Sequence, residues 1–387
     1  MGRVTSDGSR LRMAMIGGGP GSFIGPVHRM AAELDGEFQL VAGAFSRDAA
    51  KSAQAGRDYH LDPARVYASF TELIERERVR TDRVDCVSIV TPNHTHFEIA
   101  SAALRAGFHV ICDKPAAASL PEALELQSVV RGAPGIYALT YTYTGYPLVR
   151  EAREICRSGR LGRVRKAVVE YSQGWLSQPV ENGGNSQAAW RADPAKAGIG
   201  GCIGDIGVHA FNLLEFISGC EVAELCADLS SIVPGRVLDD DCNVLLRLDN
   251  GAPAVLHATQ IAAGERNRLE IHVYGELGSL AWNQERPNEL QLLWLDGRSE
   301  QIHSGAPQLG RDARAASRLP SGHPEGYIEA FANIYRDFAR TIREQGRAER
   351  DCAAGVLPGI DAGVRGMRFV DQAILSSRNR TGWVKLG

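Results

Sequence analysis

The chain has 387 residues, of which 44% are hydrophobic and 23% are charged, and its formal net charge at pH 7 is −3. This balance gives no electrostatic reason to expect a nucleic acid or an anionic membrane surface as a partner, and no apolar run approaches the roughly 18 residues of a spanning helix. Eight cysteines occur singly, without a C-x-x-C pair, so we expect no metal, no disulfide framework and a reducing, cytoplasmic location. The length suggests two domains, because single cores stop growing near about 250–300 residues.

A glycine-rich turn follows the first predicted strand. The β-prone run LRMAMIGGG, residues 11–19, leads into PGSFIGPVHRMAAEL, residues 20–34, which has the pattern of a helix beginning. A glycine turn between a strand and a helix N-terminus is how a backbone approaches a pyrophosphate. Gly17 and Gly19 supply a G-x-G, but Ser22 occupies the position of the third glycine, so the motif alone also fits a plain glycine loop.

Further apolar runs alternate with helical segments in the first third of the chain. They are EFQLVAGAFS at 37–46, VDCVSIV at 84–90 and FHVICDKP at 108–115. Near-continuous apolar strands alternating with helices are typical of a parallel sheet that is covered on both faces. We therefore predict a Rossmann dinucleotide-binding domain over residues 1–141.

Polar residues follow two of these strands, at the end where open α/β sheets bind ligands. The stretch TPNHTH, residues 91–96, follows the third strand, and Pro92 with Asn93 makes a rigid turn there. Lys114 stands directly before Pro115, which forces an extended backbone and ends the next strand. His96 and Lys114 are candidate functional residues, although each also fits a solvent-facing side chain.

The second domain, predicted over residues 142–387, is rich in β-prone runs and poor in helices. This pattern indicates an α+β domain with a large open, mainly antiparallel sheet. The stretch GDIGVHAFNLLEFISG, residues 204–219, reads as a buried helix with Asp205 and His209 on one face. Taken alone, this pair also fits a helix cap beside a satisfied core histidine. The carboxylates at 239–241 are predicted to be a solvated strand start, since neighbours in a strand point to opposite faces and cannot converge on a metal.

Several motifs occur in an order that resembles one enzyme family. The loop GGGPGSFIG, then TPNHTH, DKP and GDIGVH, are similar to those of the Gfo/Idh/MocA oxidoreductases, the glucose–fructose oxidoreductase and inositol dehydrogenase group. AWRADPAKAGIGG and HPEGYIEAFANIYRDFA extend the resemblance over essentially the whole chain. In that family the motif lysine and the D-x-x-x-H pair converge on substrate beside the nicotinamide. The resemblance therefore implies Lys114, Asp205 and His209 as catalytic residues, with Asp113 departing from the usual glutamate.

The chemistry that the resemblance implies is hydride transfer between a nicotinamide and a secondary alcohol or ketone of a sugar, sugar derivative or cyclitol. His209 would act as acid and base, because imidazole titrates near neutrality, and Lys114 would polarise the substrate oxygen. The same residues also suit a redox-neutral glycosidase or lyase that works by transient oxidation and elimination, and nothing in the sequence separates the two. A ligand-binding relative without activity is the third alternative, which the intact catalytic residues argue against.

Further contacts are expected in both domains, because aromatic faces and an arginine suit a polyhydroxylated ring. The expected substrate-binding residues are Lys114, Tyr143, Trp175, Arg191, Asp205, His209 and His323. The expected cofactor-binding residues are Gly17, Gly19, Ser22, Phe23, Ile24, Ser46, Arg47, Thr91, Pro92, Asn93, His96, Asp113 and Lys114.

The second strand bears on the choice of cofactor. Ser46 and Arg47 follow it, where an acidic residue would accept the ribose hydroxyls of NAD. A hydroxyl and a guanidinium suit a 2′-phosphate, so NADP(H) is favoured. The alternative is NAD(H) with Asp48 on the ribose, although Asp48 also fits a cap of the next helix. The resemblance further implies a homo-oligomer, a dimer or tetramer, formed through the sheet face of the second domain.

Overall fold

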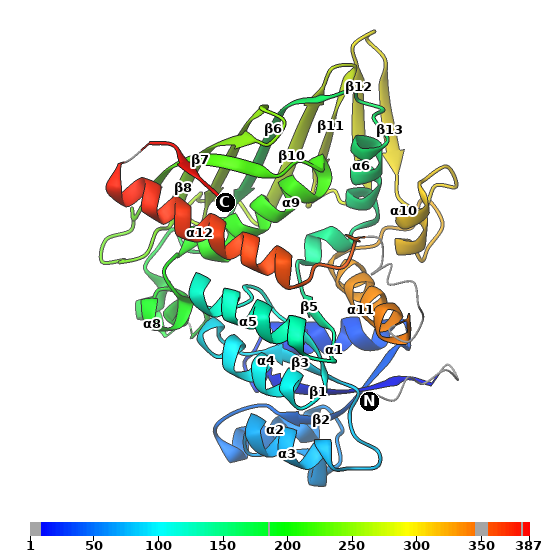
Figure 1. Ribbon diagram of the computed structural model, residues 1–387, viewed down its shortest axis with the longest axis vertical. Helices are drawn as coiled ribbons and strands as arrows, with labels where there is room; N and C mark the ends of the chain where they lie inside the picture. Colours follow the sequence, from blue (N-terminus) through cyan, green and yellow to red (C-terminus); the bar gives the residue numbers. More distant parts are fainter. Residues whose placement is uncertain (1–8, 185, 345–354, 381) are drawn as a thin grey trace. The chain divides into compact units, whose positions relative to one another are not determined.

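The computed structural model describes residues 9–184, 186–344, 355–380 and 382–387. The chain divides into two compact units. The first unit comprises Met1–Tyr141 and Phe331–Val364, and the second comprises Thr142–Ala330 and Arg365–Gly387. Figure 1 shows their elements in the colours of the sequence.

The first unit is built on a parallel sheet with strand order β2-β1-β3-β4-β5. Its strands are β1 (Leu11–Gly17), β2 (Phe38–Ala44), β3 (Cys86–Val90), β4 (His109–Cys112) and β5 (Tyr137–Leu139). Its helices include α1 (Ile24–Leu34), α2 (Ala49–Asp58), α3 (Phe70–Arg78), α4 (His96–Arg105) and α5 (Leu120–Gly132). Short 3₁₀ turns η1 (Pro63–Arg65) and η2 (Asn93–Thr95) lie between them. The predicted Rossmann architecture is confirmed.

Local sequence explains where these elements begin. Ser69 and Ser119 each accept a hydrogen bond from the backbone amide three residues on and so cap α3 and α5. Every residue of β3 is buried, as expected for a central strand that is covered on both faces. The chain order places the switch point of the sheet between β1 and β3, because β2 and β3 leave β1 on opposite sides. Ligands of such sheets bind at the carboxyl ends of the strands near that point.

A late segment of the chain returns to the first unit. Helix α11 (Tyr327–Glu344) places Phe331, Tyr335 and Phe338 on one face at helical spacing. Within the first unit, the Phe338 ring stacks on Phe38 of β2 with 6.0 Å between centroids, and the Tyr335 hydroxyl lies 2.7 Å from Nδ1 of His28. The sequence-based division assigns everything after residue 141 to the second domain, whereas the described residues 331–344 and 355–364 belong to the first unit.

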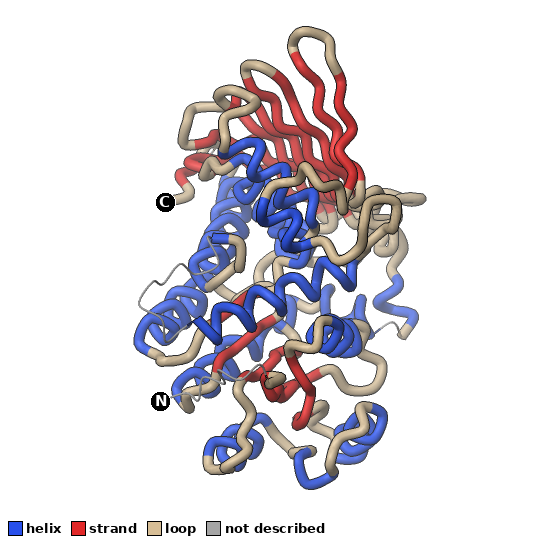
Figure 2. The backbone as a smooth tube through the Cα atoms, turned by 90° about the vertical axis from the view of Figure 1, so that its right-hand side faces the viewer, coloured by secondary structure: helices blue, strands red, loops and turns tan. Residues whose placement is uncertain are grey.

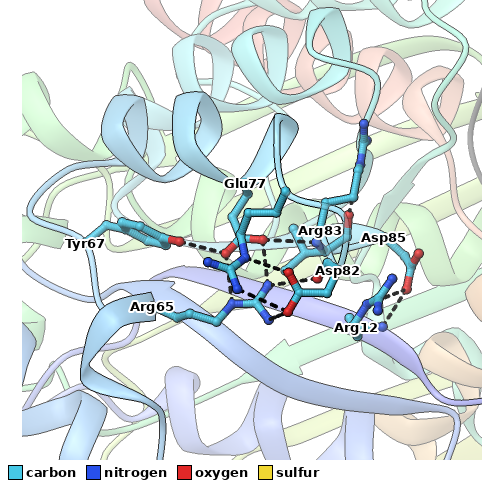
Figure 3. Close-up of polar contacts among 9 residues, drawn as sticks. Arg12, Arg65, Tyr67, Glu77, Asp82, Arg83 and Asp85 are labelled. Carbon is cyan, nitrogen blue, oxygen red and sulfur yellow. Dashed lines mark hydrogen bonds and ion pairs between the residues drawn. The ribbon is translucent and has the colours of Figure 1, made fainter.

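A buried ion network fixes the edge of the first unit around α3 (Figure 3). The Glu77 carboxylate is fully buried and accepts from Arg65 Nη2 at 2.6 Å, from the Tyr67 hydroxyl at 2.7 Å and from the Val84 amide at 3.1 Å. Burial and the neighbouring Glu77 raise the pKa of Tyr67 to about 12. Because Glu77 has this set of donors, its charge is compensated and the network serves to hold the fold.

The second unit is built on a mainly antiparallel sheet with strand order β13-β12-β11-β10-β6-β9-β8-β7-β14, in which β6 and β9 pair in parallel. Its strands are β6 (Val164–Ser172), β7 (Val222–Ser230), β8 (Asp241–Leu248), β9 (Pro253–Thr259), β10 (Arg268–Gly275), β11 (Gly278–Asn283), β12 (Glu289–Trp294), β13 (Ser299–His303) and β14 (Val384–Lys385). Figure 2 shows these strands side by side in red. The predicted open antiparallel sheet is confirmed.

Helices lie against one face of this sheet. The helices of the unit are α6 (Pro147–Arg157), α7 (Ser186–Arg191), α8 (Pro194–Ala197), α9 (Val208–Ser218), α10 (Arg311–Ala316) and most of α12 (Ile360–Asn379), with short turns η3 (Thr142–Gly145), η4 (Val180–Gly183) and η5 (Ile203–Gly207). Helices α6 and α9 lie against the strands (Figure 1), and Phe211 of α9 stacks on Phe369 of α12 at 4.4 Å. Strand residues on the other face, such as Leu245 and Tyr274, are exposed.

Candidate active site

The glycine-rich turn after β1 packs tightly against its neighbours in the first unit. A Cβ on Gly17 would lie 2.7 Å from the Val90 carbonyl oxygen, and one on Gly19 would lie 2.7 Å from the Phe45 carbonyl oxygen. Gly17 also has a φ of +90°, which side-chain-bearing residues rarely adopt. The turn therefore requires glycine at both positions and presents bare backbone at the N-terminus of α1. This geometry fits a dinucleotide pyrophosphate.

The rest of this loop leads into the first helix. The Ser22 hydroxyl accepts a hydrogen bond from the Gly25 amide at 3.2 Å, and Phe23 precedes α1 with its ring largely exposed. Ile24 is the first residue of the helix. On the other side of the loop, the Tyr59 hydroxyl donates to the Gly18 carbonyl at 3.0 Å. The loop is thus held by Ser22 from within and by Tyr59, which lies outside it in the sequence.

The stretch after β2 carries the two side chains on which the cofactor alternatives depend, Arg47 and Asp48. The Asp48 carboxylate accepts from the amides of Ala50 and Lys51 at 2.9 and 3.1 Å, so Asp48 is the N-cap of α2. Ser46 accepts from the Asp48 amide at 3.1 Å, and Arg47 is exposed. The acidic side chain of this stretch is therefore engaged by the helix, while the guanidinium faces solvent.

Two loops at the carboxyl ends of β3 and β4 carry the other predicted residues of the first unit. Asp113 Oδ1 accepts from the Lys114 amide at 2.8 Å and from the Thr140 hydroxyl at 2.9 Å. His96 is fully buried, with one ring nitrogen on the carbonyl of Thr91 and the other on that of Pro115, each at 2.7 Å. Burial lowers the pKa of His96, and the two carbonyl acceptors oppose that shift. Pro92 and Asn93 form the start of η2 beside them.

In the second unit, the helix that carries His209 begins differently from the predicted one. Residues Ile203–Gly207 form a π-helical turn, and the α-helix proper starts at Val208. Asp205 lies inside this turn, so it is not the N-cap that the simpler interpretation of the sequence suggested. Single π-turns of this kind occur frequently at functional sites.

Two of the three carboxylates at 239–241, Asp239 and Asp240, are not part of the solvated strand start that the sequence suggested; Asp241 begins β8. Asp239 accepts from the amides of Gly201 and Ile203, both at 2.7 Å, and so caps the turn before Asp205. Burial raises the pKa of Asp239 to about 6, against the effect of these two amides. Asp240 is also buried and accepts from two backbone amides and Arg236. The prediction was wrong because the strand begins at residue 241, and the preceding residues turn inward.

Asp205 is held by two side chains of the second unit. Its Oδ2 atom accepts from Arg191 Nε at 3.0 Å and from Gln260 Nε2 at 2.9 Å. The Arg191 guanidinium lies 4.3 Å over the ring of Trp190 and 5.8 Å from that of Trp175. Gln260 is buried and directly follows β9. These contacts fix the direction of the Asp205 carboxylate.

His209 is packed among tyrosines. Tyr143 meets its ring edge to face with centroids 5.0 Å apart, and the Tyr171 ring lies 6.5 Å away. The hydroxyls of Tyr143 and Tyr171 are hydrogen-bonded to each other, and Tyr171 also donates to Asn267 Oδ1 at 2.8 Å. Burial raises the pKa of both tyrosines, so they remain protonated at neutral pH. The imidazole thus lies against neutral, hydrogen-bonded rings.

The second unit therefore brings together most of the residues predicted to bind substrate in that unit. Trp175 is partly exposed and donates from its indole nitrogen to Gln173 Oε1 at 2.9 Å. His323 is exposed, with a ring nitrogen 3.3 Å from the carbonyl of Pro320, and no contact described here joins it to the group around Asp205. Gln260 was not predicted from the sequence, and Asp239 was predicted to be solvated rather than part of the site. The sequence around a polar residue beside a strand does not show which distant residue it bonds, so these contacts could not be predicted.

Comparison with known proteins agrees with this arrangement. Residues 11–141 match the family described as "Oxidoreductase family, NAD-binding Rossmann fold", and residues 149–281 match "GFO/IDH/MocA C-terminal domain". An oxidoreductase from Bacillus subtilis strain 168, described as uncharacterized and named YfiI, is 34% identical over 97% of this chain and 96% of its own length. The chain belongs to the Gfo/Idh/MocA family of oxidoreductases.

Solved structures extend the comparison to complexes. An inositol dehydrogenase homolog from Azotobacter vinelandii, complexed with NAD⁺, superposes with a TM-score of 0.94 at 36% identity, and 98% of each chain is covered. Levoglucosan dehydrogenase from Pseudarthrobacter phenanthrenivorans is 27% identical over 97% of each chain. The protein is thus an oxidoreductase whose first unit is an NAD-binding Rossmann domain. In the part of the chain that the structure describes, no helix is long and apolar enough to span a membrane.

Proposed function

We propose that the protein transfers a hydride between a nicotinamide dinucleotide and a secondary alcohol or ketone of a sugar, sugar derivative or cyclitol. The observation that carries the proposal is the group around Asp205 and His209, with a fixed carboxylate, a packed imidazole and aromatic walls in one unit of an NAD-binding oxidoreductase. The same Azotobacter homolog has been solved with NADH and myo-inositol, at 34% identity and a TM-score of 0.91. A polyol has apolar C–H faces for aromatic rings and hydroxyls for the polar groups.

The proposal gives each residue a separate task. His209 takes the hydroxyl proton of the substrate during oxidation and returns it during reduction. Lys114 polarises the same oxygen and stabilises the negative charge that develops on it. Asp205, held by Arg191, orients the imidazole or a substrate hydroxyl. Tyr143, Trp175, Arg191 and His323 complete the proposed substrate contacts.

The dinucleotide, when bound, supplies the hydride acceptor or donor. The proposed contacts of its pyrophosphate are the loop residues Gly17, Gly19, Ser22, Phe23 and Ile24. Those of its ribose and nicotinamide parts are Ser46, Arg47, Thr91, Pro92, Asn93, Asp113 and Lys114. His96 is not among them, because both of its ring nitrogens face main-chain oxygens. We propose a preference for NADP(H) over NAD(H), because Arg47 is an exposed cation whereas Asp48 is engaged as a helix cap.

We also propose that the protein is a homo-oligomer, a dimer or tetramer, formed through the uncovered face of the second unit's sheet. On that face Leu245 is 52% exposed, Tyr274 41% and Leu293 45%. Large apolar side chains exposed together are typical of a surface that a partner covers. Light scattering tests this proposal, since a mass near the 41.8 kDa of one chain would contradict it.

A substrate screen tests the reaction. Purified protein is incubated with sugars, glycosides and inositols and either NAD⁺ or NADP⁺, while absorbance of the reduced cofactor and disappearance of the substrate are both followed. Formation of reduced cofactor in proportion to oxidised substrate supports the dehydrogenase. Turnover of a glycoside without net reduction supports the redox-neutral glycosidase or lyase and contradicts the proposal.

A further inference from the structure

The His96 side chain joins two loops of the first unit. It is fully buried, with Nδ1 2.7 Å from the Pro115 carbonyl and Nε2 2.7 Å from the Thr91 carbonyl. Thr91 directly follows β3, and Pro115 lies a few residues beyond β4, which pairs with β3 in the sheet. An imidazole ring places a nitrogen at each end of a rigid plane, and here each nitrogen faces a carbonyl oxygen. A neutral ring donates to one of the two carbonyls, and a protonated ring donates to both. The ring therefore fixes the separation of the two loops.

The contact of His96 with the Pro115 carbonyl lies next to Lys114 in the chain. The Lys114 amide donates to the Asp113 carboxylate, which also accepts from the Thr140 hydroxyl. The carbonyl of the next residue, Pro115, is the one that His96 contacts. The backbone of Lys114 is thus held on both sides, by a carboxylate before it and an imidazole after it. A long flexible side chain is placed accurately when the backbone that carries it is fixed.

The Thr91 end concerns the dinucleotide-binding loop. A Cβ on Gly17 would lie 2.7 Å from the Val90 carbonyl oxygen and 2.9 Å from Cγ2 of Thr91. The first glycine of the loop is therefore in direct contact with the segment whose carbonyl His96 holds. A shift of Thr91 would move the wall against which the glycine turn is packed.

From these contacts we infer that His96 is a positioning residue, which fixes Lys114 relative to the dinucleotide-binding loop because its ring is held between the carbonyls of Pro115 and Thr91. The inference deepens the proposed function and rests on it only for the task given to Lys114. It also differs from a direct cofactor contact, because both ring nitrogens already face main-chain oxygens. Loss of His96 should therefore increase the backbone motion of the segment around Lys114 more than that of the rest of the first unit.

Backbone amide hydrogen exchange, measured by mass spectrometry, tests the position of that segment without using activity. His96→Leu removes both contacts, and His96→Gln keeps one donor. His109→Asn is the matched control, because His109 is at the opposite end of β4, where Nδ1 accepts from the Ile136 amide at 3.1 Å. In His96→Leu we expect exchange in the peptide covering 113–118 to rise about tenfold or more, the size expected for loss of a bond to a buried carbonyl.

The expected order is wild type, then His96→Gln, then His96→Leu, with the control unchanged in this peptide. Unchanged exchange over 113–118 in His96→Leu would overturn the inference. An equal rise in every peptide would also overturn it, because His96 would then support the whole unit rather than the Lys114 segment.

Kinetics then separate positioning from cofactor binding. We expect His96→Gln to lower kcat by about tenfold, with the dissociation constant for the dinucleotide little changed. In a Lys114→Met background the same substitution should add little, since the positioned group is gone. Weaker binding of the dinucleotide, with unchanged kcat and unchanged amide exchange, would make His96 a cofactor contact and overturn the inference. Absence of any dinucleotide-dependent turnover would contradict the proposed function instead, while the exchange result would still decide the role of His96.

Discussion

Arg191 donates from Nε to Oδ2 of Asp205 at 3.0 Å, and its guanidinium plane lies 4.3 Å over the ring of Trp190. Its Nη1 atom also donates to the carbonyl oxygen and to Oε1 of Gln187, at 3.1 and 3.0 Å. Most of the guanidinium group of Arg191 is therefore engaged in contacts within the protein. Its planar fork is used on three partners at once, which a lysine ammonium cannot reproduce.

Replacement of Arg191 by lysine should therefore lower activity although the charge is retained. A hydrogen bond to a charged group contributes about 1.5–3 kcal/mol, so we expect kcat/KM for Arg191→Lys to fall roughly tenfold to a hundredfold, at about 1.4 kcal/mol per factor of ten. Arg266→Ala is the control, because this arginine is 84% exposed and pairs with Glu285 at the surface. Wild-type kinetics for Arg191→Lys would show that the fork is dispensable.

His209 should be the most sensitive position of the second unit. Loss of a general base reduces rates by about 10²–10⁴, so His209→Ala should lower kcat by a factor in that range while the dinucleotide binds normally. His303→Ala is the control, since His303 is exposed on β13. Steady-state kinetics with the best substrate from the screen measure both variants. A fall of only a few fold in His209→Ala would make His209 a packed core histidine among tyrosines.

The sequence predicted the elements that depend on neighbours in the chain. Strand β1, the glycine turn and helix α1 follow from local periodicity and from glycine at Gly17, whose φ is +90°. The apolar stretch after Asp205 was likewise predicted as a buried helix, and α9 is one. These features require no information about distant residues.

The sequence could not supply the pairings that place the site residues. The Arg191–Asp205 bond joins residues 14 apart, and the Asp239–Gly201 bond joins residues 38 apart. Aspartate side chains are mostly exposed in proteins, and nothing within a run of three aspartates shows that two of them are buried. The sequence therefore favoured a solvated position for all three. Residues 331–344 join the first unit through contacts such as the Phe338–Phe38 stack, which links residues 300 positions apart and leaves no periodic signal in the sequence.

Arg47 tests the proposed preference for NADP(H). Apo protein is titrated with NADPH and NADH, and binding is followed by fluorescence. We expect tighter binding of NADPH, and we expect Arg47→Ala to weaken NADPH roughly tenfold to a hundredfold, as for loss of a charge-assisted bond to phosphate, with little effect on NADH. Arg57→Ala is the control on the helix that follows, α2, since this guanidinium donates to Gln54. Tighter binding of NADH by the wild type would contradict the preference.

Asp239 gives a prediction for stability against pH. Burial raises its pKa from 3.8 to about 6 in the folded protein, so between these values the folded state binds more protons than the unfolded state. The contribution of Asp239 to the free energy of unfolding is therefore greatest below about pH 4 and falls as the pH rises through 6. At 1.36 kcal/mol per pKa unit, the fall amounts to roughly 3 kcal/mol.

Asp239→Asn isolates this effect, because asparagine does not titrate. Asparagine offers one acceptor oxygen for the two amides of Gly201 and Ile203, so the variant should be less stable than the wild type. The deficit, measured by urea unfolding at pH 4, 5, 6 and 7, should be largest at pH 4 and shrink toward neutrality. Asp296→Asn is the control of opposite sign, since Arg298 lowers the pKa of the exposed Asp296. A deficit for Asp239→Asn that grows with pH would mean that the two amides outweigh burial and that the pKa of Asp239 is lowered.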